Sequence, residues 1–173
     1  MTVVDRAVEA LQAKFAGQVL GVESFRGETT VLLQAQVLVA ACTLLRDEPN
    51  LRFNRLSSLT AVDYWPREPR FAVVYQLYSI PHRAYFGLRF PVHGQKAEIS
   101  TLEGVYPSAN WPEREVFDMF GIRFVGHSDL RRIVMPYDWQ GHPLRKDYPL
   151  GYEEVQFSFN REEIDRKKPY ARE

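Results

Sequence analysis

The sequence predicts a two-layer α+β domain with a mixed or antiparallel sheet, helices on one face of it, and an extended C-terminal arm. Three observations support this prediction. The patterns run in the order helix, two strands, helix, three strands, helix. Links between successive strands are as short as hairpin turns, which favours antiparallel neighbours. Beyond the last helix the hydrophobic period disappears. We therefore assign residues 1–125 to a globular domain and residues 126–173 to an arm with a polar tail.

Each element is predicted from its own pattern. The first two helices have apolar residues at i, i+3 and i+4 spacing, and Gly17 and Pro49 follow their ends. The strands are rich in β-branched and aromatic residues, and Arg26-Gly27 forms the first turn between them. In chain order the predicted elements are a helix at 4–15, strands at 18–25 and 28–33, a helix at 34–48, a strand toward the end of 51–64, strands at 71–79 and 83–90, and a helix at 112–120.

The region that leads into the arm is predicted from proline, glycine and serine positions. A turn or two of helix is expected within residues 98–110. Pro112 suits the first turn of the last helix, because its missing N–H is no loss there, and Gly121 suits a left-handed helix end. A short extended piece should follow. Ser128 is then expected to cap one or two helical turns through residue 134.

Composition excludes several function classes. The chain has 22 basic and 22 acidic residues, and this zero net charge argues against nucleic acid as the main partner. A single cysteine, Cys42, cannot form an intramolecular disulfide, a four-thiolate zinc site or an iron–sulfur cluster by itself. The opening residues are too charged for a signal peptide. The most apolar run, residues 31–45, is interrupted by glutamines and is shorter than a membrane span of about 20 residues.

Motifs for cofactors and nucleophiles are missing from the sequence. No two glycines are two residues apart, so the glycine-rich turn of dinucleotide-binding folds is absent. Residues 121–128 approach the spacing of a P-loop, but His127 occupies the lysine position and a helix precedes the segment instead of a strand. There is no G-x-S-x-G elbow, and no histidine close in sequence could activate Cys42. We therefore expect no cofactor in this chain.

Two histidines leave an alternative open. His127 with Asp129, and His142 with Asp138 or Asp147, have the residue types of a metal or acid–base site. The other interpretation is that both imidazoles hydrogen-bond carboxylates or backbone groups and so shape irregular loops. We favour this second interpretation because nothing supplies a third ligand at suitable spacing.

The arm has the composition of a docking segment. Prolines and glycines prevent helix and central strand from residue 136 onward, and they separate large aromatics such as Trp139 and Tyr148 from dense charge. Such a segment cannot close a core of its own, so it either lies back over its own domain or reaches into another protein. The charges could be solvated surface groups of little energetic value. Because Trp, Tyr and Arg dominate binding hot spots, we predict a protein-docking arm.

Three stretches carry a resemblance to a known family. They are EREVFDMFGIRF at 113–124, GHSDLRRIVMP at 126–136 and DWQGHPLRKDYPL at 138–150. Together they resemble the 30-kDa subunit family (the C subunits) of NADH-quinone oxidoreductase, which is respiratory complex I. The strands near residues 62–64 and 71–75 are also similar to the family, whereas residues 1–50 add little. Ser128 departs from the proline that the family usually has.

The resemblance implies a non-catalytic structural subunit in the hydrophilic arm of complex I. In such an assembly FMN, the iron–sulfur clusters, NADH and quinone belong to other subunits. The C-terminal segment would pack against the D subunit, which helps form the quinone site beside the terminal cluster of the B subunit. Other hydrophilic-arm subunits would be further neighbours, and contact with the membrane would be indirect. The implied location is the cytoplasmic face of the bacterial inner membrane, and the activity, NADH oxidation by quinone with ion pumping, belongs to the complex.

The resemblance also defines the candidate partner interface. Arginines and lysine would pair with carboxylates of the D subunit, while aromatic and leucine side chains would fill its pockets. Two alternatives remain: the equivalent subunit of a membrane-bound hydrogenase or of a dehydrogenase fed by ferredoxin or F420, and a free-standing enzyme using the two histidines and Asp129. The interface candidates are Glu113, Arg114, Asp118, His127, Asp129, Arg131, Arg132, Asp138, Trp139, His142, Arg145, Lys146, Asp147, Tyr148 and Leu150.

Overall fold

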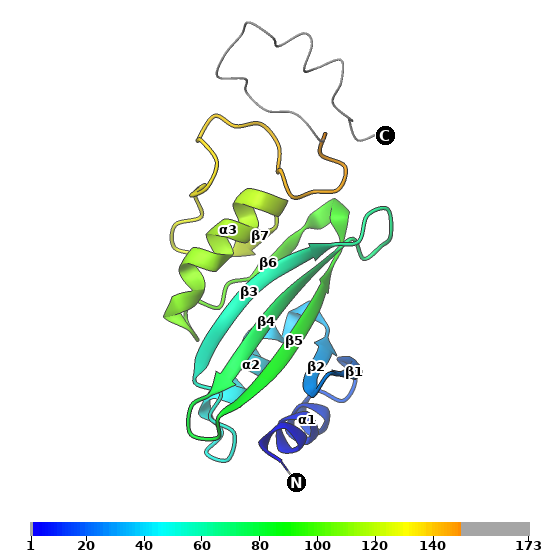
Figure 1. Ribbon diagram of the computed structural model, residues 1–173, viewed down its shortest axis with the longest axis vertical. Coiled ribbons are helices and arrows are strands. Elements are labelled where there is room, and N and C mark those ends of the chain that lie inside the picture. The colour runs from blue at the N-terminus through cyan, green and yellow to red at the C-terminus, as the bar shows by residue number, and fades with distance from the viewer. Residues whose placement is uncertain (1, 150–173) are drawn as a thin grey trace, which may run out of the picture.

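The computed structural model describes residues 2–149, and it has the predicted two-layer α+β architecture (Figure 1). The five-stranded sheet is mixed: its order is β1-β2-β5-β4-β3, with β2 and β5 parallel and the other neighbours antiparallel. The elements are α1 (Val3–Lys14), β1 (Val19–Phe25), β2 (Glu28–Leu33), α2 (Leu38–Asp47), β3 (Arg55–Asp63), β4 (Phe71–Ser79), β5 (Ala84–Val92), β6 (Glu98–Ser100), α3 (Asn110–Phe120) and β7 (Arg123–Val125), with 3-10 turns at Ala35–Val37, Gly94–Lys96 and Pro107–Ala109.

The core lies between one face of this sheet and the helices. Along β4 every second side chain is buried, beginning with Phe71 and continuing through Val73, Tyr75 and Leu77. These side chains belong to the same buried cluster as apolar residues of α1, α2 and α3. The intervening residues of β4 are mostly half-exposed on the opposite face. Burying one face of a strand and solvating the other is the alternation from which strands are predicted.

Local chemistry explains where the first elements begin and turn. Thr2 and Asp5 form a reciprocal capping box at the start of α1, with distances of 2.7 Å and 3.1 Å. Arg26 and Gly27 both adopt positive φ, of 52° and 83°, which suits a two-residue turn between β1 and β2. The hairpin predicted at this position is therefore confirmed.

Several predicted boundaries were wrong. The region 98–110 contains the predicted helical turn, at Pro107–Ala109, but it begins with strand β6. This strand pairs in parallel with β7, 25 residues further on, and local sequence does not predict such a pairing. The predicted helix at 34–48 is divided into a 3-10 turn and α2. Strand β5 continues past residue 90 and includes Pro91. Strand β2 pairs with β5 only at residues 87–89, so on that side of β5 the proline needs no N–H group for pairing.

The helical turns predicted after Ser128 are also absent. Residues 126–149, which we call the arm, contain neither helix nor strand in the described part of the chain. The backbone N–H groups of Ile133, Val134 and Met135 point to a side-chain carboxylate instead of to carbonyls one helical turn earlier. This geometry excludes a helix there. Figure 1 shows the arm rising from the end of the sheet next to α3.

Candidate partner interface

The arm is held to the domain by a buried carboxylate. Asp118 lies on α3 with its side chain fully buried, and its Oδ2 accepts hydrogen bonds from Ile133, Val134 and Met135, at 3.0 Å, 2.8 Å and 2.9 Å. Its Oδ1 is 2.6 Å from Nη1 of Arg132. Three successive backbone N–H groups around one anion form a nest of the kind that binds anions in proteins. The nest fixes the path of the arm over α3.

These donors also set the ionisation of Asp118. Burial by itself raises the pKa of this carboxyl, but the three backbone donors and Arg132 outweigh burial and hold the pKa below its usual value. Asp118 is therefore charged at neutral pH. A buried carboxylate that lost these donors would be strongly destabilising, so the helix and the arm depend on each other.

The arm supplies the missing hydrogen-bond donors at the C-terminal end of α3. The last four carbonyls of an α-helix have no partner within the helix. Here the carbonyl of Phe117 accepts from Gly121, and those of Asp118, Met119 and Phe120 accept from the arm. The arm donors are His142 Nδ1 at 2.9 Å, the Leu144 amide at 3.0 Å and Arg145 Nε at 2.6 Å.

Charge and packing agree with this arrangement. Arg132 and Arg145 place positive charge at the negative end of the helix dipole. Burial, together with the two arginines, lowers the pKa of His142, so its ring is neutral at pH 7. Gly121 closes the helix at φ 71°, and a Cβ at this position would overlap the side chains of His142 and Arg145. Only glycine satisfies both requirements.

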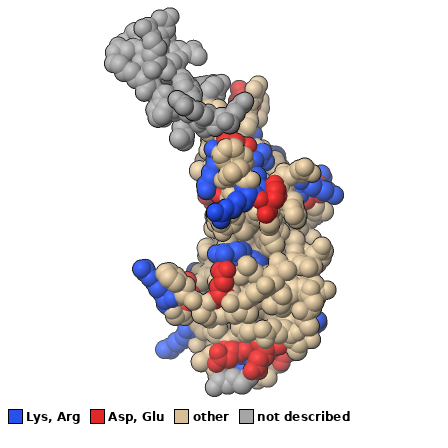
Figure 2. Space-filling model, turned by 90° about the vertical axis from the view of Figure 1, so that its right-hand side faces the viewer, with Lys and Arg blue, Asp and Glu red and all other residues tan. Residues whose placement is uncertain are grey.

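A second attachment joins the end of the arm to the sheet. Arg70 donates two hydrogen bonds to Asp63, at 2.9 Å and 3.1 Å, and two to Asp147. Asp63 also accepts the backbone N–H of Lys146 at 2.9 Å. Burial acts to raise the pKa of Asp63, yet Arg70 and the backbone donors keep it below its usual value. Two-point arginine–carboxylate pairs fix orientation as well as distance. Figure 2 shows such blue and red side chains intermixed next to the grey segment.

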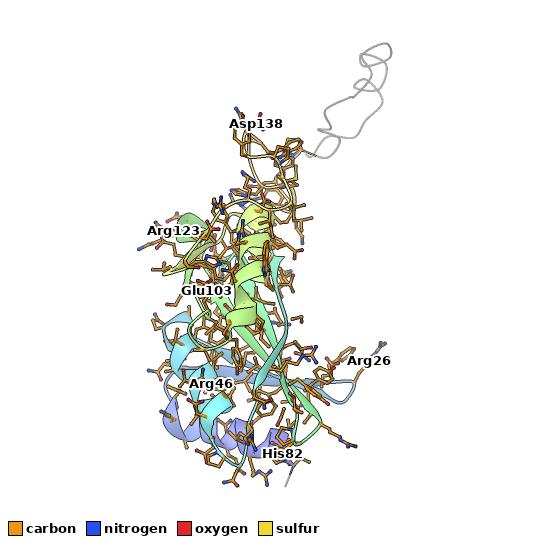
Figure 3. The ribbon with its side chains drawn as sticks, turned by 90° about the vertical axis from the view of Figure 1, so that its left-hand side faces the viewer. Arg26, Arg46, His82, Glu103, Arg123 and Asp138 are labelled. Carbon is orange, nitrogen blue, oxygen red and sulfur yellow. The ribbon has the colours of Figure 1, made fainter. Side chains whose placement is uncertain are left out.

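The start of the arm is built around a buried histidine. The side chain of His127 is fully buried; its Nδ1 accepts from the Asp129 amide at 2.9 Å, and its Nε2 lies 3.1 Å from the carbonyl of Asn110. The backbone N–H and hydroxyl of Ser128 donate to Glu103, at 2.7 Å and 2.9 Å. A proline at residue 128 would lack that N–H. Glu103 lies beside α3 in Figure 3.

Two further charges of α3 are also used inside the chain. Glu113 is fully buried and accepts from the Thr101 hydroxyl at 2.5 Å and the Leu102 amide at 2.7 Å. Burial raises the pKa of this carboxyl above its usual value. Arg114 donates from Nε to the carbonyl of Arg131 at 3.1 Å and lies over the ring of Trp111. The structure thus gives both residues an intramolecular role.

Among the described residues, neither histidine has the surroundings of a metal site. Within residues 2–149 no group of three or more His, Cys, Asp or Glu side chains is arranged to hold a metal ion. Both ring nitrogens of His127 and the Nδ1 of His142 have the partners named above, so these rings shape the loops, as in the interpretation we favoured. Of the helices described, none has the length and apolar character that crossing a membrane requires.

Comparison with known proteins identifies the family. Residues 31–154 match the model of the family described as respiratory-chain NADH dehydrogenase, 30 Kd subunit. The chain belongs to this family. A relative from Roseiflexus sp. (strain RS-1), named as the C subunit of NADH-quinone oxidoreductase, is 49% identical and covers 96% of this chain and 95% of its own length. A protein of the same name from Geotalea uraniireducens (strain Rf4) is 51% identical, over 84% of this chain and 88% of its own length.

Solved structures agree with this assignment. The trypsin-resistant fragment (1-134) of Nqo5 superimposes with a TM-score of 0.62 and 31% identity, over 75% of this chain and all of that fragment. A chain of an archaeal membrane-bound sulfane sulfur reductase gives a TM-score of 0.68 over 94% of this chain and 90% of its own. At 21% identity the second likeness shows a shared fold and nothing more.

The structure divides the predicted interface residues of this family member into three groups. The first group is bound within the chain: Glu113, Arg114, Asp118, His127, Arg132, His142, Arg145 and Asp147. The second group is exposed or half-exposed, and several of its members, such as Asp129, Arg131 and Tyr148, also have hydrogen bonds within the chain. It consists of Asp129, Arg131, Asp138, Trp139, Lys146 and Tyr148. Leu150 and the polar tail lie outside the described residues. The predicted contact of each of these residues with a partner stays a prediction.

Sequence reasoning missed two sets of residues. Asp63, Arg70 and Glu103 anchor the arm from distant elements, and only their charge could have suggested them. The interface candidates also left out the exposed apolar side chains of the arm, which follow no helix or strand period. They are Ile133, Val134, Tyr137 and Leu144, of which Tyr137 is 94% exposed.

Proposed function

We propose that this chain is a structural, non-catalytic subunit of the peripheral arm of a proton-translocating NADH-quinone oxidoreductase. Its relatives are named as the C subunit of that enzyme, which supports membership in such an assembly. In this proposal FMN, the iron–sulfur clusters, NADH and quinone are bound by other subunits. The chain would lie on the cytoplasmic face of the inner membrane, and it would touch the membrane only through the complex.

We further propose that the arm clamps the quinone-site (D) subunit, with the B subunit nearby. The observation that carries this proposal is the contrast between the two sides of the arm. Arg132, Arg145 and Asp147 are bound to α3 and Arg70. In contrast, Val134, Tyr137 and Leu144 are 59%, 94% and 54% exposed. Exposed apolar groups of this size mark interaction surfaces. Because the arm is already ordered by its own contacts, less conformational entropy would be lost on binding.

The role of such a clamp is positional. A segment held rigidly at Asp118 and Asp63 can keep a partner subunit in a fixed place relative to the sheet. Figure 3 places Asp138 far from His82, which lies near the opposite end of the molecule, and from Arg26, which projects from the side of its lower half. The isolated chain is expected to have no redox activity.

The test is recovery of the complex from host membranes with tagged variants. We expect Tyr137→Ser to reduce co-purified NADH–quinone reductase activity at least about tenfold, since exposed aromatic anchors can contribute about 2 kcal/mol or more. Its melting temperature should equal that of the native chain. Tyr85→Ser is the matched control, because Tyr85 is 54% exposed on the sheet and far from the arm.

Three kinds of result would contradict the proposal. Full co-purification of the Tyr137→Ser chain would show that the arm is not the docking element. Co-elution with a hydrogenase, or with a ferredoxin- or F420-dependent dehydrogenase without NADH activity, would indicate the related assembly instead. A metal-dependent activity of the purified chain that needs His127 and His142 would support the free-standing enzyme.

A further inference from the structure

A hollow of about 450 Å³ lies between α3 and the first half of the arm. It is lined by Arg114, Phe117, Leu130, Arg131, Arg132 and Tyr137. The lining thus places three guanidinium groups around an apolar floor. We propose that this hollow receives a single Asp or Glu side chain, flanked by apolar residues, from a partner protein of the complex. This inference rests on the proposed function and names the chemistry of the partner.

The first argument is the charge balance of the lining. Arg132 is fully engaged, with Nη1 on Asp118 and Nη2 on the carbonyl of Gly141. Arg131 and Arg114 share the other carboxylate, Asp129. Three arginines therefore face two carboxylates, and one positive charge is left in excess. One incoming carboxylate would balance it.

The second argument is that two arginines are incompletely paired. Arg131 donates two hydrogen bonds to Asp129, at 2.5 Å and 2.7 Å, and its side chain is 76% exposed. Arg114 reaches the same carboxylate only at 3.8 Å, which is too long for a hydrogen bond. Yet the Arg114 side chain is only 10% exposed, held over Trp111 and by the carbonyl of Arg131. An additional carboxylate between the two guanidinium groups would complete the bonding of a largely desolvated cation.

The third argument concerns the kind of anion. Phe117 and Leu130 form an apolar floor, and the exposed ring of Tyr137 stands at the rim. A phosphate dianion would bring two negative charges to a site with one excess positive charge, beside two carboxylates. A side-chain carboxylate carries one charge, and its neighbours in a polypeptide can cover the apolar floor. Tyr137, one of the exposed apolar side chains of the arm, also lines the hollow, so a protein segment fits it better than a free anion or a lipid headgroup.

The first experiment identifies the occupant. A photo-crosslinking benzoylphenylalanine would replace Tyr137 in the tagged full chain, and the complex would be isolated, irradiated and digested for mass spectrometry. The same group at Tyr85 serves as control. The proposal expects crosslinks to one segment of a partner subunit that has an Asp or Glu next to apolar residues.

The outcomes separate this inference from the proposed function. Crosslinks to a partner segment without any acidic residue would overturn the inference and leave the structural role intact. Crosslinks only to lipid, or to a second copy of this chain, would overturn both. An intact complex with no crosslink at residue 137 would also overturn the inference, because the hollow would then be unoccupied by protein.

The second experiment tests the charge. Arg131→Glu should reduce recovery of the complex at least about tenfold relative to the native chain. This difference between the two chains should be smaller at about 0.5 M salt than at about 0.05 M salt, because salt screens the interaction. Arg55→Glu is the control, since Arg55 is exposed at the opposite end of β3. Reversing the crosslinked acidic residue of the partner to lysine should restore assembly with Arg131→Glu. Recovery of Arg131→Glu equal to that of Arg55→Glu would overturn the inference.

Discussion

Arg70 and Asp147 are 77 residues apart in sequence and form a two-point ion pair, with N–O distances of 2.5 Å and 2.9 Å. Arg70 directly precedes β4, so this pair joins the start of β4 to the end of the arm. The same guanidinium group also holds Asp63, so three segments of the chain meet at one arginine. Interruption at any one of these points should release the arm in a measurable way.

Asp147→Asn should loosen the end of the arm while leaving the domain folded. The Asp147 side chain is 41% exposed, so the loss of global stability should be small, but the peptide bonds after Arg145 and Lys146 should become more accessible. We expect trypsin to cleave there at least about threefold faster. Glu23→Gln is the control, because it removes an exposed ion pair with Arg89 on the sheet. Equal cleavage of both variants would show that the Arg70–Asp147 pair does not hold the arm.

Asp118→Asn should be the most damaging nearly isosteric change in the arm's attachment. Both carboxylate oxygens of Asp118 accept hydrogen bonds, whereas the asparagine side chain has one accepting oxygen and one NH2 group. Either the N–H groups of residues 133–135 or Arg132 would therefore face a second donor instead of an acceptor. We expect a loss of about 3 kcal/mol in the free energy of unfolding, measured with urea. Asp138→Asn, on the exposed part of the arm, should change this free energy by less than about 0.5 kcal/mol.

Glu113→Gln should be far milder, although Glu113 is equally buried. Burial raises the pKa of Glu113, so the charged form of this carboxyl is disfavoured. The charged form of Asp118, in contrast, is stabilised by its hydrogen-bond donors. A glutamine can still accept from the Leu102 amide and can donate to the Thr101 hydroxyl. The free energy of unfolding at pH 7 should therefore change by less than about 1 kcal/mol. A loss as large as that of Asp118→Asn would show that the Glu113 charge itself is required.

The two carboxylates should give opposite pH dependences. The lowered pKa of Asp118 means that its contribution is present above the unfolded value of about 3.9 and is lost as pH falls through the folded value. The raised pKa of Glu113 means that its contribution is present below about 4.3 and is lost as pH rises through the folded value. Urea titrations between about pH 3 and pH 7 should therefore show the Asp118→Asn deficit shrinking toward low pH. Over the same range the free energy of unfolding of Glu113→Gln should increase relative to that of the native chain as pH rises.

Gly121→Ala should displace the arm from the end of α3. The added Cβ would meet His142 and Arg145, and alanine also disfavours the φ of 71°. We expect a loss of at least about 2 kcal/mol in the free energy of unfolding. Gly104→Ala is the control, because a Cβ there meets nothing within 4 Å. A Gly121→Ala chain as stable as Gly104→Ala would show that the arm does not depend on this close approach.

The sequence by itself determined the order of the three α-helices and the five long strands, the face that each helix buries and the end of α3 at Gly121. These features depend on neighbours within one or two turns, so hydrophobic period and backbone restriction are enough to predict them. The sequence also marked residues 136–149 as irregular and rich in aromatics and charge. Its motifs were specific enough to indicate the 30-kDa subunit family, which the family match confirms.

Only the tertiary structure decided which charges belong together. The local sequence around Arg145 and Asp147 would be the same whether their side chains faced solvent, a partner or their own domain. Their partners here are the carbonyl of Phe120 and the guanidinium group of Arg70, which chain folding brings close from 25 and 77 residues away. The same is true of strand β6, which exists because β7 lies beside it. Long-range pairing depends on the whole fold, whereas a local sequence pattern records only which groups are available to pair.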